Sequence, residues 1–156
     1  MTFKEDGVKD HSESTDKVSL ELDTMVQDML NHMLDALAEG EWDGVILCYE
    51  DAQANRYDAT FTEDGLEACL SAAERMVVHD AGSTPSQGIG KIVRYAIAYV
   101  GMVQDGDTYQ DAILVSFYER GQKSGYSAYL PIANIGEGDR FVWGDPLPAG
   151  AEDPLI

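Results

Sequence analysis

The stretch that decides the fold is residues 91–118, KIVRYAIAYVGMVQDGDTYQDAILVSFY. It contains two apolar segments rich in the β-branched and aromatic residues that strands favour, and the polar tripeptide Gln104-Asp105-Gly106 separates them. Glycine after polar residues is typical of a tight hairpin turn. The stretch therefore predicts two long antiparallel strands at the middle of a sheet.

The register of this hairpin follows from the length of its turn. A two-residue loop mixes large and small side chains on both faces. A three-residue loop at 104–106 pairs Ile97 with Ile113 and Ala98 with Ala112, so that one face is bulky and the other small. Because a slip by one residue exchanges the faces, this sorting favours the three-residue loop.

The two faces of the hairpin predict different roles. The bulky face, which carries Tyr95 and Ile97, should meet the core. The small face, with Ala96, Ala98 and Ala112, either accepts a closely packed helix or stands partly exposed as a binding surface. Both interpretations of the small face stay open at this point.

Two segments have the apolar spacing of amphipathic helices. In 20–39, apolar residues recur every three or four positions, Ser19 is a suitable N-cap, and Gly40 ends the pattern. In 62–78 the same spacing follows Thr62, a second suitable N-cap. These are the two helices that we expect.

Shorter strands flank the helices and the hairpin. The apolar run 45–49 suits a strand covered on both faces, and 55–61 alternates like a half-exposed partner in a hairpin. Further strands are expected at 125–132 and 140–143. The sequence predicts an α+β fold: a mostly antiparallel β-sheet of about five to six strands, in the order α-β-β-α-β-β-β-β, with two helices packed on one face.

The domain organisation is simple. Residues 1–16 are charged and polar and predict a flexible N-terminal tail. Residues 17–145 form a single α+β domain. Residues 146–156 contain three prolines and predict an extended C-terminal tail whose last two residues pack back on the body.

The charge balance restricts the partners. The chain has 29 acidic and 10 basic residues, a formal net charge of −19. This field repels nucleic acid and anionic membranes, so we expect neither as a partner, and it favours a basic protein. The acidic residues are spread along the whole chain, so solubility is an alternative explanation of the charge.

No pattern of catalytic or ligating residues stands out. The three histidines and the two cysteines lack metal-ligand spacing, so no metal, no cofactor and no catalytic residue is predicted. Cys48 and Cys69 fall on apolar faces and should fill the core. The N-terminus lacks the apolar region of a signal peptide, and we expect a cytoplasmic location.

In size, acidic charge and order of elements, the chain resembles two groups of small acidic bacterial proteins. These are the secretion chaperones that bind their clients as dimers and the immunity proteins that neutralise basic toxins. The resemblance implies a non-enzymatic protein-binding module, and a homodimer is compatible with it. The expected surface is the small sheet face or the helix with Met25, Met29 and Met33. The candidate contacts are Tyr99, Tyr126 and Tyr129.

A small enzyme or ligand-binding protein is the alternative function. Its pocket would lie between the sheet and the Gly- and Ser-containing loop at 80–90. His79, just before that loop, or one of the acidic residues would act as the base. A pocket that gathers His79 with two carboxylates would favour this alternative.

Overall fold

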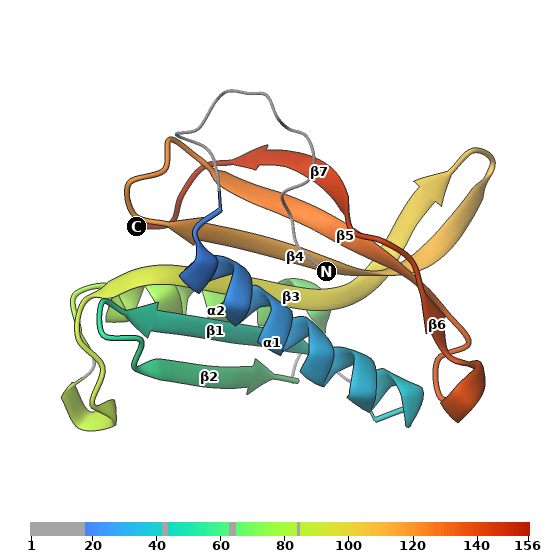
Figure 1. The fold of residues 1–156 in the computed structure, drawn as a ribbon, viewed down its shortest axis with the longest axis horizontal. Helices are drawn as coiled ribbons and strands as arrows, with labels where there is room; N and C mark the ends of the chain where they lie inside the picture. Colours follow the sequence, from blue (N-terminus) through green and yellow to red (C-terminus); the bar gives the residue numbers. More distant parts are fainter. Residues whose placement is uncertain (1–17, 42–43, 63–64, 84) are drawn as a thin grey trace.

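The structure is a computed structural model that describes residues 18–41, 44–62, 65–83 and 85–156. A curled antiparallel sheet lies between two helices (Figure 1). The helices are α1 (Leu20–Ala38) and α2 (Leu66–Asp80), with short 3₁₀ turns η3 (Pro85–Gln87) and η4 (Gly138–Arg140). The strands are β1 (Val45–Asp51), β2 (Arg56–Phe61), β3 (Ile92–Asp105), β4 (Thr108–Glu119), β5 (Gly125–Ala133), β6 (Val142–Trp143) and β7 (Leu147–Glu152).

The sheet has the order β2-β1-β3-β4-β5-β6, and β7 also pairs with β5. The predicted element order and the central place of the β3–β4 hairpin are confirmed. The segment 146–156, for which the sequence predicts an extended tail, contributes the strand β7, and Leu155 and Ile156 pack on the core. The predicted tail at 1–16 lies outside the described residues. Neither described helix is both long and apolar enough to cross a membrane.

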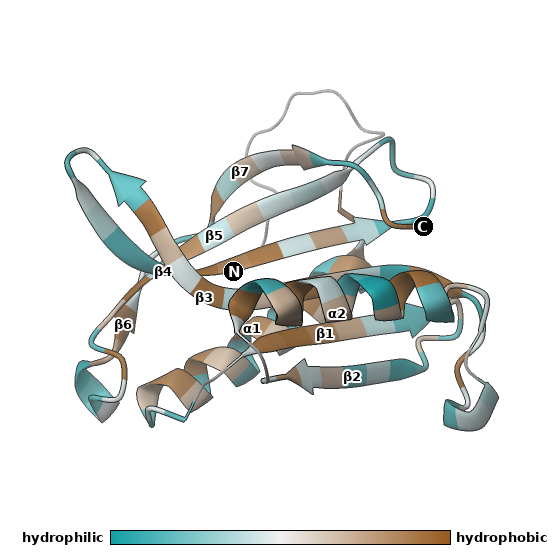
Figure 2. Ribbon diagram, turned by 180° about the vertical axis from the view of Figure 1, so that it is seen from behind, coloured by the Kyte–Doolittle hydropathy of each residue, from teal (hydrophilic) through white to brown (hydrophobic). Residues whose placement is uncertain are grey.

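The two helices cover opposite faces of the sheet, so the prediction that both pack on one face is wrong. The apolar stripe of α1 packs against Cys48, Ala96 and Ala98, whereas α2 packs against Leu47 and the residues that alternate with the alanines. In Figure 1, α1 lies in front of the sheet and α2 behind it, and Figure 2 shows the reverse view. Every residue of β1 is buried because β1 lies between the helices.

The small face of the hairpin is covered by α1. Ala96 and Ala98 are fully buried beneath this helix, which can approach closely because alanine side chains are short. Met25, Met29 and Met33 are buried on the other side of the same contact. The small face and the methionine-bearing helix are therefore core, and the expectation that one of them is the binding surface is wrong.

The hairpin register differs from the predicted one. The turn consists of Gly106 and Asp107, with Asp105 opposite Thr108, so that Ile97 lies opposite Ser116 and not Ile113. The sizes of the side chains do not identify the register here, because both faces of the hairpin are buried in the core. Beneath α1 the actual register places large residues beside small ones: Phe117 lies opposite Ala96.

The helix boundaries agree with the prediction for α1 and differ for α2. Ser19 Oγ accepts a hydrogen bond from the Leu22 amide at 3.0 Å, which is the predicted N-cap. The helix α2 begins at Leu66 and not at Thr62, after Gly65 with a φ of 88°. A left-handed residue at this point breaks the helical path that the apolar spacing alone would continue.

Candidate functional site

The outer part of the β3–β4 hairpin extends beyond its neighbouring strands (Figure 1). β1 begins at Val45, opposite Tyr99, so no strand in the described part of the chain pairs with 100–105 on that side. The paired residues of β4 and β5 begin at Ala112. Residues 100–111 therefore form a projecting two-stranded ribbon, which we call the arm.

The arm carries exposed apolar side chains on the side of the sheet that α1 covers elsewhere. Met102 is 62% exposed and Tyr109 is 64% exposed. Strand alternation places Met102 on the same face as Ala98, and Tyr109 on the same face as the buried Ile113. Figure 2 shows the hydrophobic stretch of β3 just before its hydrophilic end.

Trp143 of β6 is a further exposed apolar side chain on this side of the sheet. It is 53% exposed and lies opposite Ile132, on the α1 side of β5. Gln110 Nε2 donates to the Ile132 carbonyl at 3.0 Å, which keeps β4 beside β5 at this level. Met102, Tyr109 and Trp143 thus lie on the same side at the same end of the sheet.

A cavity of about 300 Å³ opens where β1 begins. It lies between the C-terminal end of α1 and the N-terminal end of α2, and its lining is mostly apolar. The lining residues are Leu37, Gly44, Thr62, Gly65, Leu66, Cys69, Val100 and Ile135. Val100 and Met102 point to the same face of β3, so the exposed Met102 follows a residue of the cavity lining along that face. We call the cavity together with Met102, Tyr109 and Trp143 the arm surface.

The charge of the arm is entirely negative. Residues 100–111 contain Asp105, Asp107 and Asp111 and no lysine, arginine or histidine. Asp111 lies opposite Met102, directly on the apolar face. The arm surface therefore combines exposed apolar and aromatic groups with carboxylates that attract cations.

Comparisons with known proteins found no relative of this chain. Neither protein-family models, nor curated proteins, nor solved structures gave a match to this chain. The function is therefore interpreted from the geometry and the charge of the chain itself.

The structure separates the three predicted contact tyrosines. Tyr99 lies opposite Leu114, which in turn lies opposite Tyr129, so both tyrosines belong to one cross-strand row on the α2 face. Tyr126 lies opposite Phe117 and packs on the α1 face. All three are half-buried, and none belongs to the arm surface. Burial, followed by the carboxylates of Glu152 and Glu74, raises the pKa of Tyr99 above its ordinary value.

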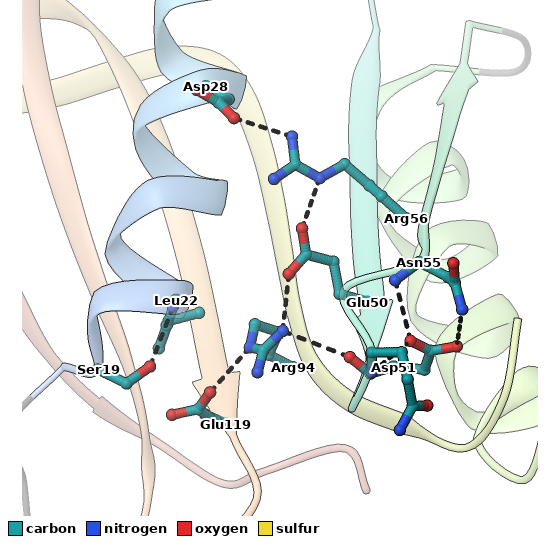
Figure 3. A network of polar contacts seen from close by, with 10 residues as sticks. Ser19, Leu22, Asp28, Glu50, Asp51, Asn55, Arg56, Arg94 and Glu119 are labelled. Carbon is teal, nitrogen blue, oxygen red and sulfur yellow. Dashed lines mark hydrogen bonds and ion pairs between the residues drawn. The ribbon is translucent and has the colours of Figure 1, made fainter.

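A row of charged side chains crosses β2, β1, β3 and β4 beneath α1 (Figure 3). Arg94 Nη1 lies 2.7 Å from Glu50 Oε1, and Arg94 Nε lies 2.8 Å from Glu119 Oε2. Arg56 Nε lies 2.6 Å from Glu50 Oε2, and its Nη1 lies 3.0 Å from Asp28 of α1. Because these groups pair with one another, the row links β2, β1, β3 and β4 and leaves little capacity for a ligand, and the partly exposed Arg56–Asp28 pair extends it to α1.

The predicted catalytic alternative has a different geometry from the one expected. His79 Nδ1 lies 2.9 Å from Asp80 Oδ1, and Asp80 Oδ2 accepts from the Tyr49 hydroxyl at 2.8 Å. The ring of His79 is 87% exposed and is joined to one carboxylate, not two. The cavity described above lies at the other end of β1. Within the described ranges, no group of His, Cys, Asp and Glu side chains is arranged to hold a metal ion.

Asp51 anchors the loop at 80–90 and the β1–β2 turn. Its carboxylate accepts from the amides of Gly90, Asn55 and Gln53 and from Asn55 Nδ2 at 2.8–2.9 Å. These hydrogen bonds, with that from Gly90 first, lower the pKa of Asp51 to about 2. The carboxylate is a structural clamp at the end of the sheet opposite the arm.

Sequence reasoning missed Met102, Tyr109 and Trp143. Each lies in a segment that reads as an ordinary strand. The available signal was strand length, because β3 has 14 residues and its neighbour β1 has 7. A strand twice as long as its neighbour must leave part of its edge unpaired, and the apolar residues on that part are exposed.

Proposed function

We propose that this protein is a non-enzymatic binding module for a basic protein and that it binds through the arm surface. The observation that carries the proposal is that Met102, Tyr109 and Trp143, all more than half exposed, lie on the same side and at the same end of the sheet, where an apolar cavity also opens. Methionine and aromatic residues are enriched in protein interfaces, and residues that dominate binding cluster around pockets.

The charge of the chain supports a basic partner. The net charge is −19, and the arm holds three of the carboxylates and no basic residue. Such a field accelerates association with a cationic surface and opposes association with an acidic one. Asp111 beside Met102 is placed to pair with a lysine or arginine at the edge of the apolar contact.

A reducing compartment, such as the cytoplasm, belongs to the same proposal. Cys48 and Cys69 are both buried and are not joined in a disulfide. Free cysteines that pack in the core are usual in proteins of such compartments.

The test is affinity capture from a lysate of the source cells, followed by binding measurements with the purified partner. We expect Met102→Ser combined with Trp143→Ser to weaken binding at least about tenfold, roughly 1.4 kcal/mol. The matched control is Val78→Ser on α2, which removes an apolar side chain of similar exposure elsewhere and should leave binding unchanged.

The dependence of the binding affinity on ionic strength is the second measurement. Raising the ionic strength should weaken the complex of a basic partner because exposed charges are screened beyond about 10 Å at 0.1 M. A partner that binds the double variant as well as the wild type, or whose association is insensitive to salt, contradicts the proposal.

A further inference from the structure

The free edge of β3 has the properties of a template for strand pairing. From 100 to 103 it reads Val-Gly-Met-Val, with no charge and no proline. The outer strand β2 presents the exposed charges Arg56 and Asp58, and β7 contains Pro148. Charges and prolines protect sheet edges against pairing with another chain. In the part of the chain that the structure describes, β6 has only two residues, so β3 presents the longest edge without such protection.

The backbone of β3 directs unpaired groups to this edge. Arg120 N donates to the Val93 carbonyl at 2.8 Å, so the odd-numbered residues of β3 bond to β4. The β3–β4 register runs without a shift from Arg94 to Asp105. Met102 and Gln104 therefore point their backbone N–H and C=O groups away from β4, toward the free edge.

We infer that an extended segment of the basic partner pairs with 100–105 of β3 as an additional β-strand. This inference rests on the proposed function and names how the partner is held. Main-chain hydrogen bonds to Met102 and Gln104 would supply affinity, and alternate side chains of the segment would supply specificity.

The surroundings of the edge define the chemistry of that segment. Next to Val100 the edge adjoins the cavity, which accepts an apolar side chain. Toward the turn the edge ends at Asp105 and Asp107, which favour lysine or arginine. The expected segment therefore presents an apolar residue at one end, basic residues at the other, and no proline between them.

Charge selects such a segment over a second copy of this chain. Two copies paired through this edge would bring together two molecules of net charge −19 and two sets of arm carboxylates. Like charges facing each other across an interface destabilise it, whereas a basic segment gains from the same field.

The test uses the purified full chain as bait for a displayed library of random linear peptides. We expect enriched peptides with an apolar residue and a run of Lys or Arg. Met102→Pro removes the N–H that points to the free edge while the β3–β4 bonds at odd positions remain, and it should weaken these peptides at least about tenfold. Met102→Val keeps the N–H and a β-favouring apolar side chain, so any loss that it shows measures the contribution of the Met102 side chain alone, and Met102→Pro should bind at least about tenfold more weakly than Met102→Val.

Circular dichroism and the amide signals of β4 establish that both variants keep the hairpin. Peptides that bind Met102→Pro as tightly as Met102→Val overturn the inference, as does a library that yields no enriched peptide. A wild-type dimer that becomes monomeric in Met102→Pro also overturns it, because a second copy would then occupy the edge. A captured partner could also bind Met102→Pro and fail to bind Trp143→Ser. That result contradicts the inferred strand pairing but not the proposed function.

Discussion

Arg94 and Glu50 form an ion pair inside the molecule, with Nη1 and Oε1 2.7 Å apart and side chains only 8% and 4% exposed. The pair lies in the row that joins four strands to α1 (Figure 3). Burial opposes the charge of Arg94, but hydrogen bonds to Glu119 and Glu50 outweigh it and raise its pKa above the ordinary value. The row therefore depends on Arg94 for the neutralisation of two carboxylates.

Replacing Arg94 should be costly. In Arg94→Met the carboxylate of Glu50 stays buried with one partner fewer, and breaking such a pair typically costs roughly 3–5 kcal/mol. We expect a loss of this size in the free energy of unfolding, measured by urea denaturation. Arg140→Met is the matched control because the Arg140–Glu137 pair is exposed, and exposed pairs contribute about 0–1 kcal/mol. Equal losses in the two variants would show that the buried row is unimportant.

Asp51 should make part of the stability depend on pH. Its pKa in the folded chain is lowered to about 2 by the hydrogen bonds from Gly90 and Asn55, whereas an unfolded aspartate titrates near 3.9. A lowered folded-state pKa stabilises the fold above the unfolded value, and this contribution is lost as the pH falls from about 4 to about 2. We expect Asp51→Asn to be less stable than wild type at pH 7, and the urea midpoints of the two proteins to converge over that acid range. A difference that is constant with pH would contradict the clamp.

The burial of Ala98 under α1 makes a third prediction. Ala98→Leu inserts a branched side chain into a filled contact, and such overpacking typically costs about 1–3 kcal/mol. Ala151→Leu on the exposed strand β7 is the control and should change stability by less than about 0.5 kcal/mol. Urea denaturation of both variants checks the prediction, and a neutral Ala98→Leu would mean that the small face is open.

The continuous apolar run of β1 predicts its burial on both sides. The fold class is predicted by the spacing of apolar residues in the helices and by the alternation of apolar and polar residues in the strands. The opposite placement of the helices follows from the same run. A strand such as Val45–Asp51 that is apolar on both sides requires a cover on each side, and only two helices were available to supply it.

The register and the site were harder to predict for a common reason. Where both faces of a hairpin are buried, side-chain size does not identify the face, and Phe117 opposite Ala96 shows that large and small residues pair within one face. Met102 and Trp143 are exposed because of where neighbouring strands begin and end. That information depends on pairing between distant segments and is absent from local spacing.

The C-terminal residues should control the titration of Tyr95. Leu155 and Ile156 pack on the cluster that contains Tyr95, and the Leu155 amide donates to its hydroxyl at 3.0 Å. Burial raises the pKa of Tyr95 to about 12 because the phenolate loses hydration. Replacing both residues by glycine removes the cover and should move this pKa toward 10, followed by NMR of ring-labelled tyrosine. Tyr95→Phe assigns the signal, and an unchanged pKa would show that the C-terminal residues do not shield it.

The rates at which the two cysteines are alkylated test whether the cavity beside the arm admits small molecules. Cys69 lines this cavity, whereas Cys48 is buried beneath α1, where burial and then the hydrogen bond with Asp58 raise its pKa above the ordinary value. The thiolate is the reactive form, so Cys48 should resist alkylation. We expect iodoacetamide to label Cys69 before Cys48 under native conditions, measured by mass spectrometry of timed samples.

A variant that fills the cavity separates local access from unfolding. Val100→Phe places a larger side chain in the cavity lining and should slow the labelling of Cys69 without changing that of Cys48. If the two cysteines react at the same rate, and both rates follow the urea-induced loss of structure, the reagent reaches them only through global unfolding. In that case the cavity does not admit small molecules, and an apolar side chain of a partner could not enter it without displacing the ends of α1 and α2.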